Sequence, residues 1–130
     1  MTAAVGCTTT VMYPGPRRPA QEVAVLTNDD TAIDVLDGQE FMHLHSQNNA
    51  RYEVLPGRHR LGVSVFAVSA NPGGYGDIER SPTTIFVCLD AEAGHTYVVG
   101  YEGRGAGWRP IATDQNTRAP VPWVACTVNG

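Results

Sequence analysis

The sequence predicts an all-β protein, an antiparallel β-sandwich of about seven to nine short strands with little or no helix. Two segments of the same design support this prediction. A Pro-Gly turn at residues 55–57 leads into an alternating run at 58–68, and a second turn at 91–94 leads into another run at 95–101. No stretch keeps the apolar spacing of a helix over three turns, so strands joined by tight turns are expected throughout.

The expected strands are separated by turn residues. Asp37-Gly38 is typical of a tight hairpin turn, and the Gly- and Pro-rich stretch at residues 70–82 is predicted to be a loop. The predicted strands, in chain order, are residues 21–27, 31–36, 41–46, 51–55, 58–68, 83–89, 95–101, 108–113 and 121–128.

Alternation along these strands predicts which side chains face the core. Ile33 and Val35 are expected on one face of their strand, with Asp34 on the other. In the run at 58–68, the apolar positions Leu61, Val63 and Val65 alternate with polar or small residues, which is typical of a half-buried antiparallel strand. Tyr52 and Val54 are expected to point inward from residues 51–55.

Length and charge restrict the classes of protein that the chain can represent. A chain of 130 residues is expected to form one domain with its own core. All nine basic residues are Arg, but they are scattered, and the formal net charge is −4. Because a nucleic-acid-binding protein normally shows a basic stripe, we expect no nucleic-acid partner. No apolar run approaches the ~20 residues of a membrane helix.

The N-terminus resembles the end of a bacterial lipoprotein signal. Small residues precede Cys7 in the run Ala3-Ala4-Val5-Gly6-Cys7, and in such signals the Cys is lipidated and begins the mature protein. Ala4 stands where Leu is usual, and the charged and most of the apolar parts of a signal are absent; an upstream start codon would explain that absence. The alternative is an accidental Cys in a disordered tail.

The segment after Cys7 is rich in Pro. Three prolines within residues 14–19 stiffen the chain toward extended geometry. Residues 1–20 are therefore interpreted as the end of a signal followed by a tether, and residues 21–130 as one β-sandwich domain. The lipoprotein resemblance implies a membrane anchor through Cys7. Thr8, in place of Asp, implies the periplasmic face of the outer membrane, with a soluble periplasmic protein as the alternative.

Cys88 and Cys126 both lie in apolar, strand-like surroundings. In an oxidising compartment two such cysteines can pair, which would close a loop of about 38 residues and add about 3–4 kcal/mol in the chain-entropy model. The alternative is two buried free thiols. Their spacing does not suit zinc, whose ligands come in close pairs.

Three segments in this order resemble a known group of envelope domains: Asp37-Gly38, the run LPGRHRLGV at 55–63, and AGHTY at 93–97. Over residues 20–101 they are similar to small bacterial lipoproteins and to PEGA-like, transthyretin-like β-sandwich domains. The resemblance implies the sandwich fold and an accessory or binding module. It carries no catalytic residues.

Four histidines are candidate ligands for a metal or a small molecule: His43, His45, His59 and His95. His43 and His45 alternate along a strand, which would place both imidazoles on one side, about 7 Å apart. His59 and His95 follow the two turns and would approach each other if those turns lie at the same end. The sequence indicates no third ligand, so no metal or cofactor is assigned, and solvent-facing or hydrogen-bonded histidines are the alternative.

No residue is assigned a catalytic role. Ser64, Ser69 and Ser81 have no nearby His in the sequence, and nucleophilic catalysis would need that pairing. The Gly-rich run at 103–107 follows a strand, whereas a phosphate-binding loop opens a helix. The sequence therefore favours a protein that is not an enzyme.

Exposed aromatic residues are the remaining candidates for binding. Tyr75, in the predicted loop, and Trp108 are expected to contact a sugar or a protein partner; the alternative is that Trp108 and Trp123 fill the core. We expect a non-enzymatic cell-envelope lipoprotein domain that is structural or binds an envelope protein or a cell-wall partner. The alternative is a small-ligand or metal-binding module that uses the His and aromatic positions.

Overall fold

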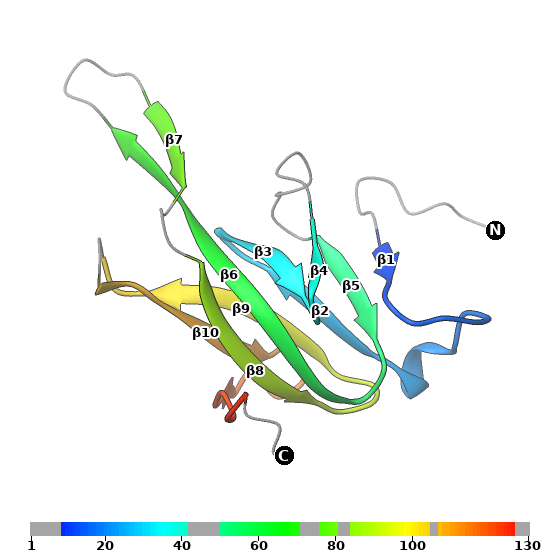
Figure 1. The fold of residues 1–130 in the computed structure, drawn as a ribbon. Helices are drawn as coiled ribbons and strands as arrows, with labels where there is room; N and C mark the ends of the chain where they lie inside the picture. Colours follow the sequence, from blue (N-terminus) through cyan, green and yellow to red (C-terminus); the bar gives the residue numbers. More distant parts are fainter. Residues whose placement is uncertain (1–8, 42–49, 71–75, 81–83, 105–106, 127–130) are drawn as a thin grey trace.

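A computed structural model of the chain confirms the all-β fold (Figure 1). The structure describes residues 9–41, 50–70, 76–80, 84–104 and 107–126, with the backbone alone for 66–70 and 76–80. The named helical element in these residues is the 3-10 turn η1 (Ala20–Glu22). The strands are β1 (Thr9–Val11), β2 (Ala24–Asn28), β3 (Thr31–Leu36), β4 (Gln39–Glu40), β5 (Arg51–Val54), β6 (Gly57–Ala70), β7 (Gly76–Arg80), β8 (Ile85–Ala91), β9 (Thr96–Glu102), β10 (Arg109–Asp114) and β11 (Pro120–Val121).

The strands form two mostly antiparallel sheets. The first sheet has the order β1-β5-β2-β9-β10-β11, and the second has the order β4-β3-β6-β7, with β8 also paired to β6. Only the β1–β5 and β2–β9 pairs are parallel among the described strands. The strand number exceeds the expected seven to nine because short edge strands such as β1, β4 and β11 carry too little alternation to be recognised in the sequence.

The core lies between the two sheets and is built from alternating positions. Leu61 and Val63 of β6 are fully buried, as the alternation predicts, and they face a cluster that includes Leu26 of β2 and Val99 of β9. Tyr97, 1% exposed, is the largest of the fully buried side chains. Because burial of each such side chain contributes about 1.5–3 kcal/mol, this layer supplies most of the driving force for folding.

One predicted face is wrong, because β3 contains a bulge. The register with β6 shifts between Ile33 and Val35, and one extra residue reverses the alternation of every side chain beyond it. Leu36 therefore joins Ile33 in the core. Val35, expected inward, lies beside Gly62 on the outer face of the sheet.

The predicted hairpin turn at Asp37-Gly38 is confirmed. Leu36 pairs with Gln39 across it, and Asp37 and Gly38 have φ angles of 51° and 86°. Two consecutive positive φ angles define the turn that matches the twist of a hairpin, and Asp-Gly is a preferred pair for it.

Three predicted segments differ in the structure. The loop expected at 70–82 is wrong in part, because β6 runs to Ala70 and β7 pairs with its far end. This hairpin projects beyond the other strands (Figure 1). Phe41 follows β4, and the rest of the strand expected at 41–46 lies outside the described residues. Of the strand expected at 121–128, the described part, up to residue 126, contains only the end of β11 and an isolated pairing of Val124.

The sequence predicted a tether for the residues before 21, but the described part of this segment begins with a strand of the first sheet. β1 pairs with β5, and beyond it Tyr13 is buried and donates a hydrogen bond of 2.5 Å to Glu53 Oε1. The Arg17 guanidinium contacts both oxygens of the same carboxylate, at 3.3 and 2.9 Å. One buried carboxylate on β5 therefore attaches the chain from Thr9 to Arg17 to the domain.

Electrostatics favour the charged form of this carboxylate. The hydrogen bonds from Arg17 lower the pKa of Glu53 and outweigh the opposing effect of burial, with further lowering by Tyr13. Glu53 is therefore ionised at neutral pH, and the attachment combines a charge-assisted pair with a phenol hydrogen bond.

We predict that Glu53→Gln lowers the free energy of unfolding at neutral pH by about 1–2 kcal/mol, because the amide keeps the shape and loses the charge. The folded-state pKa of Glu53 lies below its unfolded value of 4.5. Its contribution is therefore present above that pH and is lost as the pH falls through the folded pKa. Urea unfolding at neutral pH and at a pH well below 4.5 should show the gap between wild type and variant narrowing at the lower pH. The exposed Glu40→Gln is the control, and an equal gap at both pH values would contradict the assignment.

Candidate functional site

His59 joins two turns of the second sheet. It lies two residues after Gly57, whose φ of 128° makes the turn into β6. Its Nδ1 is 2.5 Å from Asp37 Oδ2, and its Nε2 is 2.6 Å from the Leu55 carbonyl oxygen. The other oxygen of Asp37 accepts a bond of 2.8 Å from the Arg60 backbone N–H. Both ring nitrogens therefore contact other residues of the domain, and the side chain, which is 13% exposed, links the two turns.

His95 makes a similar contact in the first sheet. Its Nδ1 is 2.7 Å from Asp114 Oδ2, and Asp114 Oδ1 accepts a bond of 2.8 Å from the Asn116 backbone N–H. Burial alone would raise the pKa of Asp114, but the bonds from His95 and from the backbone N–H groups of Asn116 and Thr117 outweigh it and lower the pKa. The charged carboxylate thus holds the turn after β10 and orients an imidazole that is 28% exposed.

The histidines named from the sequence therefore do not share one site in the described structure. His59 and His95 each have their own carboxylate, on different sheets. Among the described residues, no group of three or more His, Cys, Asp or Glu is placed to hold a metal ion. His43 and His45 lie outside the described residues, so a metal site that includes them stays a prediction.

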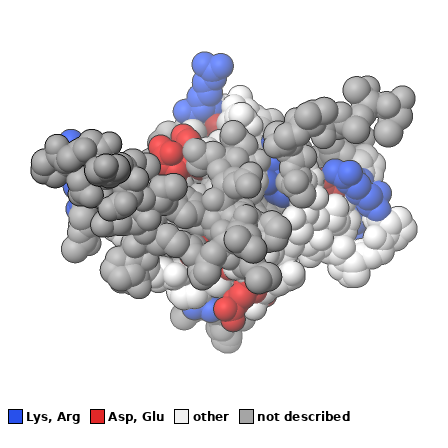
Figure 2. Space-filling model, turned by 90° about the horizontal axis from the view of Figure 1, so that it is seen from above, with Lys and Arg blue, Asp and Glu red and all other residues white. Residues whose placement is uncertain are grey.

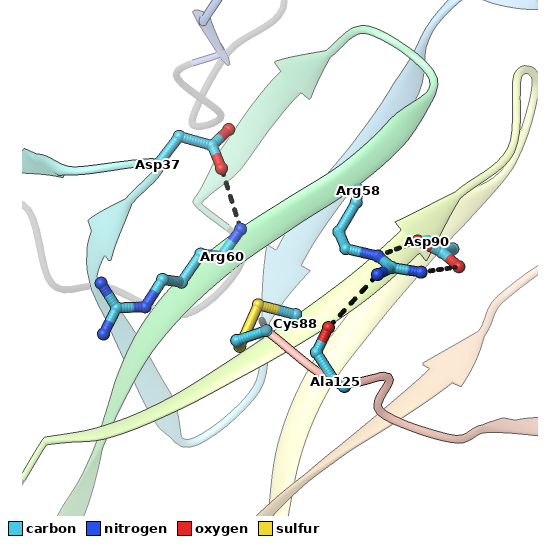
Figure 3. The surroundings of a disulfide bond; sticks show 7 residues. Asp37, Arg58, Arg60, Cys88, Asp90 and Ala125 are labelled. Atoms are coloured by element: carbon cyan, nitrogen blue, oxygen red, sulfur yellow. Dashed lines mark hydrogen bonds and ion pairs between the residues drawn. A yellow bond between two sulfur atoms is a disulfide. The ribbon is translucent and has the colours of Figure 1, made fainter. Parts of the chain in front are cut away.

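The expected disulfide is confirmed: Cys88 of β8 is bonded to Cys126, with the Cα atoms 5.2 Å apart. The chain reaches this point after β11 by pairing Val124 with Cys88, whose carbonyl accepts a bond of 2.9 Å from the Val124 N–H. Beside the bridge, Arg58 holds the Asp90 carboxylate and the Ala125 carbonyl together (Figure 3). The disulfide, the pairing and the arginine form what we call the C-terminal clasp.

The outer face near the clasp carries one exposed aromatic side chain. Phe86, 43% exposed, lies over Gly62, where an added Cβ would be only 2.9 Å from its Cε1 atom. The Arg60 guanidinium stacks on the same ring at 4.2 Å from its centre. Gly62 therefore provides the room in which Phe86 covers the strand backbone.

The two tryptophans differ in burial. Trp108, named as a partner contact, is 8% exposed and belongs to the core cluster, so that expectation is wrong. Trp123 is only half-buried, and its Nε1 donates a bond of 2.9 Å to the Pro110 carbonyl. It lines a mostly apolar groove of about 370 Å³ along β10, β11 and the residues that follow. Tyr75, the other candidate, lies outside the described residues.

This groove is a candidate binding feature that the sequence did not reveal. Apolar residues dominate its lining, and two charged side chains, Glu102 and Arg109, accompany them. These two residues stand directly opposite each other on β9 and β10 and form an exposed ion pair. The only sequence signal was the density of Pro and Trp at residues 120–123, which by itself also fits a core plug or a loop.

Charge elsewhere is dispersed. On the face seen in Figure 2, the described acidic and basic side chains are scattered and form no single patch. In the part of the chain that the structure describes, no helix is long and apolar enough to cross a membrane.

Removal of the disulfide should destabilise the fold. The bridge joins residues 38 positions apart, so we predict that Cys88→Ser combined with Cys126→Ser lowers the free energy of unfolding by about 3–4 kcal/mol. Denaturant unfolding of the oxidised wild type measures the loss, and wild type kept in a reductant should match the double variant. Cys7→Ser is the control and should unfold like wild type. Unfolding of the double variant at the wild-type midpoint would contradict a stabilising role.

Comparisons with known proteins identify no relative: no protein-family model, no curated protein and no solved structure matches this chain.

Proposed function

We propose that this protein is a non-enzymatic cell-envelope lipoprotein domain, anchored through a lipid on Cys7, that binds a partner within the envelope. The observation that carries the proposal is the Cys88–Cys126 disulfide. Structural disulfides form and persist in oxidising compartments and are rare in the cytosol. A bridge built into the sheet of a small domain therefore supports export, which is also what the lipoprotein-like residues before Cys7 imply.

The polar clusters support a binding or structural role. His59–Asp37 and His95–Asp114 have the atom pairing of a catalytic base with its orienting acid. In both pairs, however, the carboxylate also accepts a backbone N–H, from Arg60 of β6 or from Asn116 in the turn after β10, and both nitrogens of His59 are engaged. These contacts give each histidine and carboxylate a structural role in holding the backbone.

The cysteine arrangement supports Cys7 as the modified residue. The sequence contains three cysteines, and two of them are joined to each other. Cys7 is thus the one cysteine left for acylation. Several acyl chains on one residue give stable attachment, where a single chain binds only weakly. With Thr8 following Cys7, the proposed location is the periplasmic face of the outer membrane.

Metabolic labelling tests the anchor. The gene, in its native genomic context, is expressed in a Gram-negative host fed an alkyne fatty acid. We expect label on the wild-type protein and its recovery in the outer-membrane fraction, whereas Cys7→Ser should be unlabelled and soluble. The double variant Cys88→Ser with Cys126→Ser is the matched control, because it removes cysteines and should keep the label.

A thiol assay separates export from anchoring. Maleimide-polyethylene glycol should modify no cysteine of the wild-type protein before reduction and two cysteines after it, because one cysteine carries lipid and two form the bridge. Modification of Cys7 without reduction, together with a soluble wild-type protein, would refute the lipid anchor. Modification of Cys88 or Cys126 without reduction would refute the oxidised, exported state.

A further inference from the structure

The groove beside Trp123 extends along the start of β10. Arg109 lies opposite Glu102, and three positions further on Ala112 lies opposite Val121 of β11. Three residues of strand measure about 10 Å, so the groove has the ion pair at one end and the apolar Ala112–Val121 pair about 10 Å away. Its volume of about 370 Å³ is in the lower part of the range for small-ligand sites.

The Trp123 ring is fixed before any ligand arrives. Its Nε1 donates to the Pro110 carbonyl at 2.9 Å, which orients the indole. The next residue, Val124, pairs with Cys88, and Cys126 is covalently bonded to the same residue. The hydrogen bond of the indole and the two contacts of the residues that follow it thus hold the ring, and a ligand that stacks on it loses little free energy to ordering the protein.

The charges that line the groove cancel. Glu102 and Arg109 form an ion pair that is exposed to solvent, with side chains 45% and 73% exposed. Their planar carboxylate and guanidinium supply both acceptors and donors, while the remaining lining is mostly apolar. The complementary ligand is uncharged, has one apolar face and carries several hydroxyl groups at its edge.

A sugar ring has these properties. One face of a pyranose presents C–H groups that pack on an aromatic ring, and its edge carries hydroxyls that both donate and accept. We propose that the groove binds one or two rings of a neutral glycan, stacked on Trp123 and hydrogen-bonded at the edge by Glu102 and Arg109. The inference rests on the proposed envelope function only for the source of the glycan, which would be the cell wall.

An extended peptide is the competing occupant, and the structure favours it less. Strand addition needs an open sheet edge, and β11, at this edge, is only two residues long. A Pro-rich peptide would need a row of aromatic pockets, whereas Trp123 is the single aromatic residue among the described residues that line the groove.

Titration of the oxidised full chain with a neutral trimer of N-acetylglucosamine tests the proposal by tryptophan fluorescence. Trp108→Phe leaves Trp123 as the reporting indole. We expect a saturable shift with a dissociation constant of about 0.1–1 mM. Trp123→Ala should weaken binding at least about tenfold, measured by calorimetry. Trp123→Phe keeps an aromatic in the groove, should retain part of the affinity, and guards against simple unfolding of the alanine variant.

Matched variants test the polar edge. Arg109→Ala and Glu102→Gln should each weaken binding about five- to tenfold. Arg104→Ala and Phe86→Ala, which alter an exposed arginine and an exposed aromatic outside the groove, should leave the affinity unchanged. A trimer of galacturonate, which is anionic, should bind the wild type more weakly than the neutral trimer and gain affinity in Glu102→Gln, because Arg109 then loses its partner.

Three results would overturn the proposal: no shift with the neutral trimer up to about 10 mM, binding that Trp123→Ala does not change, or tighter binding of a Pro-rich peptide that Trp123→Ala abolishes. None of these results depends on the lipid. Failure of glycan binding therefore leaves the labelling outcome for Cys7 intact, and failure of labelling leaves the groove result intact.

Discussion

The pairing of Val124 with Cys88 brings the end of the chain from the edge of one sheet to the edge of the other. Without that crossing, the Cys88 carbonyl on β8 would lose the Val124 N–H that bonds to it. The disulfide makes the crossing permanent, and Arg58 adds contacts to Asp90 and to the Ala125 carbonyl. The position of Trp123, and with it the shape of the groove, follows from this one closure.

A second constraint concerns the turns. Asp37 and Asp114 make the same pair of contacts. One carboxylate oxygen accepts a backbone N–H, and the other contacts the imidazole of a histidine that follows another turn. This explains why two similar turn-plus-strand segments both carry a histidine near the turn. The two similar segments in the sequence therefore repeat one structural role. In each, polar side chains bond to backbone groups at or beside a turn that the strand hydrogen bonds do not satisfy.

The sequence predicted the features that depend on local pattern or on chemistry that has few solutions. Asp37-Gly38 permits two positive φ angles, so the hairpin could be predicted. The alternation around Leu61 and Val63 predicted that these side chains face the core. The Cys88–Cys126 pairing was indicated because both cysteines lie in apolar, strand-like stretches of the sequence. Each of these inferences needs only neighbouring residues or a very short list of partners.

The remaining features depend on contacts between distant segments. The bulge in β3 is set by pairing with β6, and nothing within residues 31–36 marks the extra residue. β1 exists because Tyr13 and Arg17 find Glu53, some forty residues away in the chain. The roles of Trp108 and Trp123 depend on which of them the C-terminal clasp places at the surface. The groove could not be inferred from composition for the same reason.

The position of β1 has a consequence for how far an anchored domain can reach. Only Thr8 separates Cys7 from the first residue of the strand in the sequence, and a linker of that length spans at most about 7 Å. A lipid on Cys7 would leave the sandwich almost no slack and hold it against the headgroups. Its search volume would then be a thin layer at the membrane surface, and any envelope ligand must be present within that layer to be captured.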